Sequence, residues 1–115
     1  MILDTYIPYF KLMKILITGC AGFVGSNLVK KISRDFDLIL VDDLISTGGS
    51  IIKATQFLKK QKCRRVFVAC THALLVNDAA KKIKNAGVSQ IISTNTIPGD
   101  SAKVDVSKVI SDALK

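Results

Sequence analysis

The sequence predicts an α/β fold with a parallel sheet, and two observations lead to that class. Short apolar runs that favour strands alternate with longer segments whose apolar residues recur at helical spacing. A helix between two strands returns the chain to the same end of the sheet, so consecutive strands pair in parallel. At 115 residues, of which 49% are hydrophobic and 23% charged, the chain has the size and composition of one globular domain. We expect about four strands, with a short fifth as an option, and connecting helices.

The first half of the chain contains two predicted strands and one predicted helix. Residues 14–18 form an apolar run before Gly19, as in a buried strand. Apolar residues at 23, 24, 28, 29 and 32 then follow helical spacing, with polar residues on the other side. Residues 38–41 are the second buried strand, and they lead into a turn-rich loop with the sequence DDLISTGGS.

The second half repeats the alternation without repeating the sequence. A helix is expected over residues 50–61, and a strand over 65–70. Asn77 is placed to cap a helix that ends at Gly87. The remaining expected elements are a strand at 90–93, a short strand at 103–106, and a helix from a Ser107 cap to Leu114.

Charge and cysteine content narrow the classes of partner and compartment. The formal net charge is +8, from 17 Lys and Arg against 9 acidic residues, all of them Asp. We interpret this as a solvated basic surface or as a rim that attracts an anionic ligand. Aromatic residues are not interleaved with the basic ones, so nucleic acid is a weaker interpretation. Cys20, Cys63 and Cys70 lack metal-ligand spacing, which favours free thiols, and cytoplasm is the expected compartment.

Residues 1–12 lack the charged start and long apolar centre of a signal peptide. MKILITG at residues 13–19 reads like the beginning of a protein, so we interpret residues 1–12 as a leader segment before a single α/β domain at 13–115. Apolar runs stay short of the roughly 18 residues that a membrane span needs, so no membrane partner is expected.

The first motif is a glycine loop between the first strand and its helix. Gly19, Gly22 and Gly25 have the spacing that allows a tight turn and close approach of the backbone to a pyrophosphate. Asp42, at the end of the next strand, is placed to hold ribose hydroxyl groups. The sequence thus predicts a Rossmann-like, NAD(P)-type loop. A merely tight strand-to-helix turn remains the alternative.

Residues 13–50 resemble the N-terminus of extended short-chain dehydrogenases, the nucleotide-sugar epimerase and dehydratase group, through MKILITG, AGFVGSNL and LILVDDL. This resemblance implies NAD(P) binding by Gly19, Gly22, Gly25 and Asp42. That family's Tyr-x-x-x-Lys pair does not follow, because Tyr6 and Tyr9 precede the glycines and neither has Lys four residues later. No catalytic residue is therefore assigned.

The second motif is VDDLISTGGS at residues 41–50. Amides and hydroxyl groups of Thr47, Gly48, Gly49 and Ser50 are suited to wrap a monophosphate. Asp42 and Asp43 are suited to bind sugar hydroxyls or a magnesium ion. A polar helix-capping loop would also account for the Ser, Thr and Gly residues.

From about Leu38 onward the chain resembles the last part of ribose-phosphate pyrophosphokinase, the phosphoribosyl pyrophosphate synthase. The segments that carry this resemblance are VDDLISTGGSIIKA, RRVFVACTHALL, AGVSQIISTNTIP and KVDVSKVI. It implies that Asp42, Asp43 and Thr47 to Ser50 form a ribose-5-phosphate loop, with His72 in a structural or rim role. The N-terminal half of that synthase is missing, so half of a substrate site is left.

Together the two resemblances predict a chimeric or truncated phosphate-binding domain, joined near residues 38–50, that binds ligand without turnover. The alternatives are a ligand-free folding scaffold, or a subunit of a pyrophosphokinase-like or epimerase-like enzyme. In both of these families the strands progress in one direction across the sheet, so the resemblances imply the strand order 1-2-3-4. Such a one-way order places the connecting helices on one face of the sheet. We expect the other face to expose alternate apolar residues, and therefore a homodimer.

Overall fold

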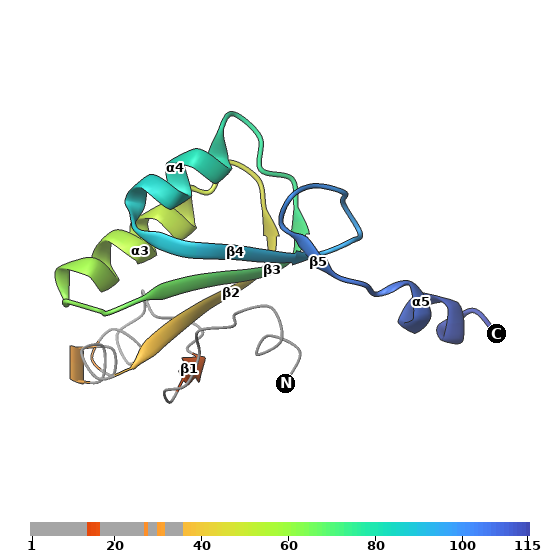
Figure 1. Cartoon of the computed structure of the whole chain (residues 1–115), viewed down its shortest axis with the longest axis horizontal. Coiled ribbons are helices and arrows are strands. Elements are labelled where there is room, and N and C mark those ends of the chain that lie inside the picture. The colour runs from red at the N-terminus through yellow and green to blue at the C-terminus, as the bar shows by residue number, and fades with distance from the viewer. Residues whose placement is uncertain (1–13, 17–26, 28–29, 32–35) are drawn as a thin grey trace.

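A computed structural model describes residues 14–16, 27, 30–31 and 36–115. Strands and helices alternate along the chain (Figure 1), and their bounds are β1 Lys14–Leu16, β2 Asp37–Ile45, α3 Gly49–Lys60, β3 Val66–Ala73, α4 Ala79–Ala86, β4 Val88–Thr94, β5 Ala102–Val104 and α5 Ser107–Ala113. The three glycines of the predicted dinucleotide loop, Cys20 and the predicted leader lie outside the described residues.

The strands form one sheet in the order β1-β2-β3-β4-β5, and every neighbouring pair is parallel. Lys14 pairs with Asp37, Leu38 with Val66, and Val68 with Ile91. This confirms the predicted α/β class and the one-way strand order. The expected short fifth strand is β5, at the edge beside β4.

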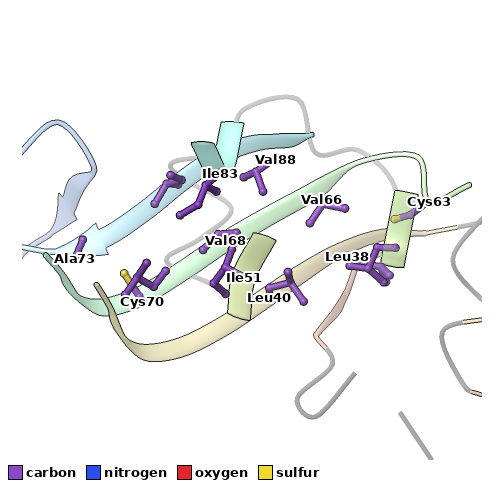
Figure 2. Close-up of a cluster of buried hydrophobic side chains, with 13 residues drawn as sticks. Leu38, Leu40, Ile51, Cys63, Val66, Val68, Cys70, Ala73, Ile83 and Val88 are labelled. Atoms are coloured by element: carbon purple, nitrogen blue, oxygen red, sulfur yellow. The ribbon is translucent and has the colours of Figure 1, made fainter. Parts of the chain in front are cut away.

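Helices α3 and α4 lie on the same face of the sheet and enclose the main core (Figure 1). Right-handed crossovers that move one way across a sheet place their helices on one side. Ile51 and Leu58 of α3 and Ile83 of α4 are at most 6% exposed. They pack against alternate residues of the strands (Figure 2), among them Leu38, Leu40, Val66, Val68, Cys70, Val88 and Ile91.

The opposite face of the sheet carries a second, smaller cluster. Ile39, Phe67 and Ile92 are 5%, 4% and 1% exposed, with Ala69 and Val104 packed against them. The expectation that this face exposes its alternate apolar residues is wrong for these three. Part of their cover is local, because the guanidinium of Arg65 lies 5.7 Å from the centroid of the Phe67 ring.

Several predicted boundaries shift by a few residues. Strand β2 continues to Ile45, so Asp42 and Asp43 lie in a strand and not in the expected loop. Asp78, not Asn77, is the residue before α4, and it has a positive φ of 58° with no side-chain cap among the described residues. Ser107 is the first residue of α5 and not its cap.

Helix α5 projects away from the sheet (Figure 1), and every residue in it is exposed. The turn before it is fixed by hydrogen bonds. Asn95 Nδ2 donates to Asp105 Oδ1 at 2.9 Å, and the amides of Val106 and Ser107 donate to Asn95 Oδ1 and Asp105 Oδ1. The direction in which the chain leaves the sheet is therefore set by specific contacts.

Two further predictions concern the thiols and the membrane. Cys63 and Cys70 are free and buried, as predicted. Burial raises the pKa of both thiols, that of Cys70 to about 11. Among the described helices, none has the length and apolar character needed to cross a membrane.

Candidate functional site

A cavity of about 390 Å³ lies where β2 ends and α3 begins. The carboxyl ends of parallel strands meet at one rim of the sheet, where α/β proteins usually bind ligands. The residues that line the cavity come from the end of β2, the connecting loop and the first turns of α3: Asp42, Leu44, Ile45, Ser46, Thr47, Gly48, Gly49, Ser50, Ile51 and Lys53.

The cavity brings together most of the predicted phosphate-site residues. Asp42 and the loop residues Thr47 to Ser50 all line it, whereas Asp43 does not. Asp43 directly follows Asp42 in β2, and a hydrogen bond joins the two carboxyl groups. The two carboxyl groups therefore lie next to each other, although only Asp42 lines the cavity.

Gly48 sets the shape of the loop. Its φ of +79° is in the left-handed region that glycine tolerates best. A Cβ atom at this position would lie 2.8 Å from Ile83 Cδ1 of α4, so the loop also packs closely against the second helix. The Gly48 carbonyl accepts a hydrogen bond from the Ile52 amide at 2.8 Å, which begins α3 directly after the loop.

The first turn of α3 faces the cavity without a cap. No side chain among the described residues caps this helix, and its first turn contains no acidic residue. The unpaired amides of a helix N-terminus and the helix dipole both favour an anion. Gly49 and Ser50, which line the cavity, lie in this turn.

Lys53 also lines the cavity, and the sequence analysis did not select it. It follows Ser50 by three residues on α3, so the two side chains share one face of the helix. That i, i+3 spacing is the signal in the sequence that could have identified Lys53. Lys53 adds a positive charge to the same cavity that Asp42 lines.

Polar side chains of β3 and β4 extend the rim beyond this cavity. His72 Nδ1 lies 2.8 Å from Thr96 Oγ1. Thr94 Oγ1 donates to the Thr71 carbonyl at 2.7 Å, and Thr96 Oγ1 donates to the same carbonyl at 3.0 Å. His72 thus sits in a threonine network at the strand ends, which fits the predicted rim position.

Hydrogen bonds link the two aspartates to each other and to the backbone. Asp42 Oδ1 accepts a hydrogen bond from the Asp43 amide at 2.9 Å, and Asp43 Oδ1 accepts one from the Leu44 amide at 2.8 Å. The pKa of Asp43 is lowered, first by its hydrogen bond with the Asp42 carboxyl group and then by the Leu44 amide. Asp43 is therefore a carboxylate at neutral pH. Among the described residues, no group of three or more His, Cys, Asp or Glu side chains is arranged to hold a metal ion.

Comparison with known proteins identifies the family. The family described as "Phosphoribosyl synthetase-associated domain" matches residues 26–114. The chain belongs to this family. The match begins directly after Gly25 and upstream of residue 38, where the sequence analysis placed the start of this resemblance.

Relatives of this phosphoribosyl synthetase-associated domain are longer proteins. It is 46% identical over 78 residues to ribose-phosphate pyrophosphokinase 1 of Archaeoglobus fulgidus, a match that covers 68% of this chain and 28% of the relative. It is 42% identical over 79 residues to the ribose-phosphate pyrophosphokinase of Methanothermobacter thermautotrophicus, covering 69% and 28%. The domain thus spans just over a quarter of the length of these relatives.

A solved structure shows the same fold. The phosphoribosylpyrophosphate synthetase of Mycobacterium smegmatis superposes with a TM-score of 0.71 at 20% identity, and the match covers 97% of this chain and 48% of that chain. At this level of identity the similarity concerns the fold alone.

Proposed function

We propose that the cavity at the end of β2 binds the phosphate and ribose of a ribose-5-phosphate-type ligand. The observation that carries the proposal is that Asp42 and the loop residues Thr47 to Ser50 line one cavity. The chain that contains this cavity belongs to the phosphoribosyl synthetase-associated family and is similar to ribose-phosphate pyrophosphokinases.

The lining supplies donors for a phosphate and an acceptor for a sugar. The hydroxyls of Thr47 and Ser50 and the amides of the first turn of α3 donate to phosphate oxygens. Lys53 adds a charge-assisted hydrogen bond. The carboxyl oxygens of Asp42 accept hydrogen bonds from ribose hydroxyls.

Magnesium fits this arrangement as a companion of the ligand. Mg²⁺ usually takes one or two protein carboxylates and completes its shell with water and phosphate oxygens. Asp42, with Asp43 beside it in β2, supplies carboxylates of that kind. The ion would screen the repulsion between these carboxylates and the ligand phosphate.

For pyrophosphoryl transfer we propose that residues beyond this chain are required. Because the chain matches 28% of the length of the pyrophosphokinase from A. fulgidus, we propose a ligand-binding domain without turnover of its own. A subunit that completes a pyrophosphokinase-like site with a partner chain is the second candidate. NAD(P) binding by Gly19, Gly22 and Gly25 stays a prediction, because those glycines lie outside the described residues. The joining of two families also stays a prediction.

Isothermal titration with ribose 5-phosphate, in the presence and absence of Mg²⁺, tests the proposal. We expect saturable binding that weakens about tenfold in Thr47→Ala and in Ser50→Ala, as for the loss of one hydrogen bond to a charged group. Ser111→Ala, an exposed hydroxyl change on α5, is the matched control and should bind as the wild type does. Absence of binding at millimolar ligand, or equal affinity in all three variants, would reject the site and favour a ligand-free scaffold.

A further inference from the structure

A second cavity, of about 370 Å³, lies between α4 and the β4–β5 loop. Its volume is in the range of small-molecule sites, about 300–1,000 Å³. The loop rises on the same side of the sheet as α4 (Figure 1), so the two segments form opposing walls. This cavity, which we call the α4–β5 pocket, shares no lining residue with the cavity at the end of β2.

The floor of the α4–β5 pocket is apolar. Ala73 and Ile91 are 6% exposed each and belong to the main core. Leu75 and Ala80 are half-buried and pack against that core. A ligand that enters the pocket therefore meets hydrocarbon side chains at its base, which favours an apolar or planar body.

The rim of the α4–β5 pocket is basic on balance. Lys84 comes from α4 and Lys103 from β5, so two ammonium groups from different elements line one cavity. Neither lysine forms an ion pair with another residue in the described part of the chain, and Asp100 is the single acidic residue of the lining. Two positive charges against one negative charge favour an anionic group on the ligand.

One residue of the pocket wall has a strained backbone. Leu75 has a φ of 50°, in the left-handed region that costs roughly 1–2 kcal/mol for such a side chain, and Asn77 and Asp78, which follow it outside the lining, have φ values of 54° and 58°. Hydrogen bonds hold the segment in place. The amides of Leu74 and Leu75 donate to the Ile45 carbonyl at 3.0 and 3.1 Å, and the Val76 amide donates to the Ser46 carbonyl at 3.0 Å. Strain that the surrounding structure maintains in this way is typical of ligand sites.

We propose that the α4–β5 pocket binds a small organic anion, with an apolar or planar body on Leu75, Ala80 and Ile91 and a phosphate or carboxylate group at Lys84 and Lys103. The proposal does not depend on ribose-phosphate binding at the end of β2. It predicts that a ligand with both an apolar body and an anionic group binds more tightly than a ligand with only one of them, because only the first contacts both the apolar floor and the two lysines.

Titration of ¹⁵N-labelled protein with phenyl phosphate, followed by amide NMR shifts, is the test. We expect saturable shifts at Leu75, Gly99 and Ser101, with weaker or no saturation by inorganic phosphate or benzyl alcohol. Benzoate in a parallel titration distinguishes a carboxylate ligand from a phosphate ligand. Shifts confined to residues 47–50 would place the probe in the other cavity and overturn the proposal.

Two variants and one matched control test the residues. Lys84→Gln/Lys103→Gln should weaken phenyl phosphate at least about tenfold, because charge-assisted hydrogen bonds are lost. Lys82→Gln/Lys108→Gln removes two exposed lysines that line neither cavity and should stay within about twofold of the wild type. Ala80→Leu should fill the floor and abolish binding. Equal affinity in all variants would overturn the proposal.

Discussion

At the scale of single residues, Asp37 shows how this sheet tolerates a fully buried charge. Its side chain is 0% exposed at the start of β2. Arg64 Nε donates to Oδ1 at 3.1 Å, and Arg65 Nε donates to Oδ2 at 3.1 Å. Both carboxylate oxygens are therefore paired. The two arginines, which directly precede β3, link the start of β3 to the start of β2. Burial raises the pKa of Asp37, but the hydrogen bonds from Arg65 and Arg64 outweigh burial, so the pKa is lowered overall.

Asp37→Asn should lower the free energy of unfolding by about 2–3 kcal/mol at pH 7. The substitution removes the buried negative charge and leaves one arginine N–H without its acceptor oxygen. The pKa of Asp37 in the folded state lies below the reference value of 3.8. The stability that its ion pairs contribute is therefore complete above about pH 4 and is lost as pH falls through the folded pKa. Urea unfolding of wild type and variant at several pH values measures this. A difference that stayed constant below pH 4 would contradict the assignment.

Asp112→Asn is the matched control for that experiment. Asp112 is 50% exposed and pairs with Lys108, which is 85% exposed. Exposed pairs of this kind contribute roughly 0–1 kcal/mol. We therefore expect a much smaller change from Asp112→Asn than from Asp37→Asn at pH 7.

At the scale of elements, the junction of β2 and α3 depends on two glycines with different roles. Gly48 has a positive φ, and a side chain there would meet Ile83. Gly49 begins α3 and has no atom within 4 Å of an added Cβ. The same substitution at adjacent positions should thus have opposite consequences.

Gly48→Ala should destabilise the domain by about 1–2 kcal/mol, from left-handed backbone strain and contact with α4. Gly49→Ala should leave stability unchanged or raise it by up to about 1 kcal/mol, because alanine favours a helix over glycine. Urea unfolding of both variants gives the comparison. Similar destabilisation by both would mean that the loop does not have the described conformation.

At the scale of the whole molecule, the most exposed large apolar side chains of the described residues lie at the C-terminal end of the chain. Val109, Ile110 and Leu114 are 71%, 51% and 83% exposed at the end of a chain that Asn95 and Asp105 direct away from the sheet. Clustered apolar side chains on a surface favour association. The homodimer predicted from sequence stays a prediction, now with α5 as its contact.

Light scattering at micromolar concentration tests this prediction. We expect a dimer in the wild type and a monomer in Val109→Ser/Leu114→Ser, since these changes remove the two most exposed apolar side chains of that region. Because α5 is exposed throughout, the urea midpoint measured on monomeric protein should change little. A monomeric wild type would reject the dimer, and a dimeric variant would place its contact elsewhere.

The sequence by itself determined the α/β class and the position of the turn at Thr47 to Ser50, because apolar runs, helical spacing and glycines at a turn are local patterns. The one-way strand order followed from the resemblance to known families, and the phosphate-binding role of the turn stays a prediction. The tertiary structure alone decided where β2 ends. Leu44 and Ile45 continue the strand because His72 and Ala73 of β3 pair with them, and that continuation places Asp42 and Asp43 within the strand. The burial of Ile39, Phe67 and Ile92 and the exit of α5 through Asn95 and Asp105 have the same origin. They rest on contacts between residues far apart in the chain, which no local pattern contains.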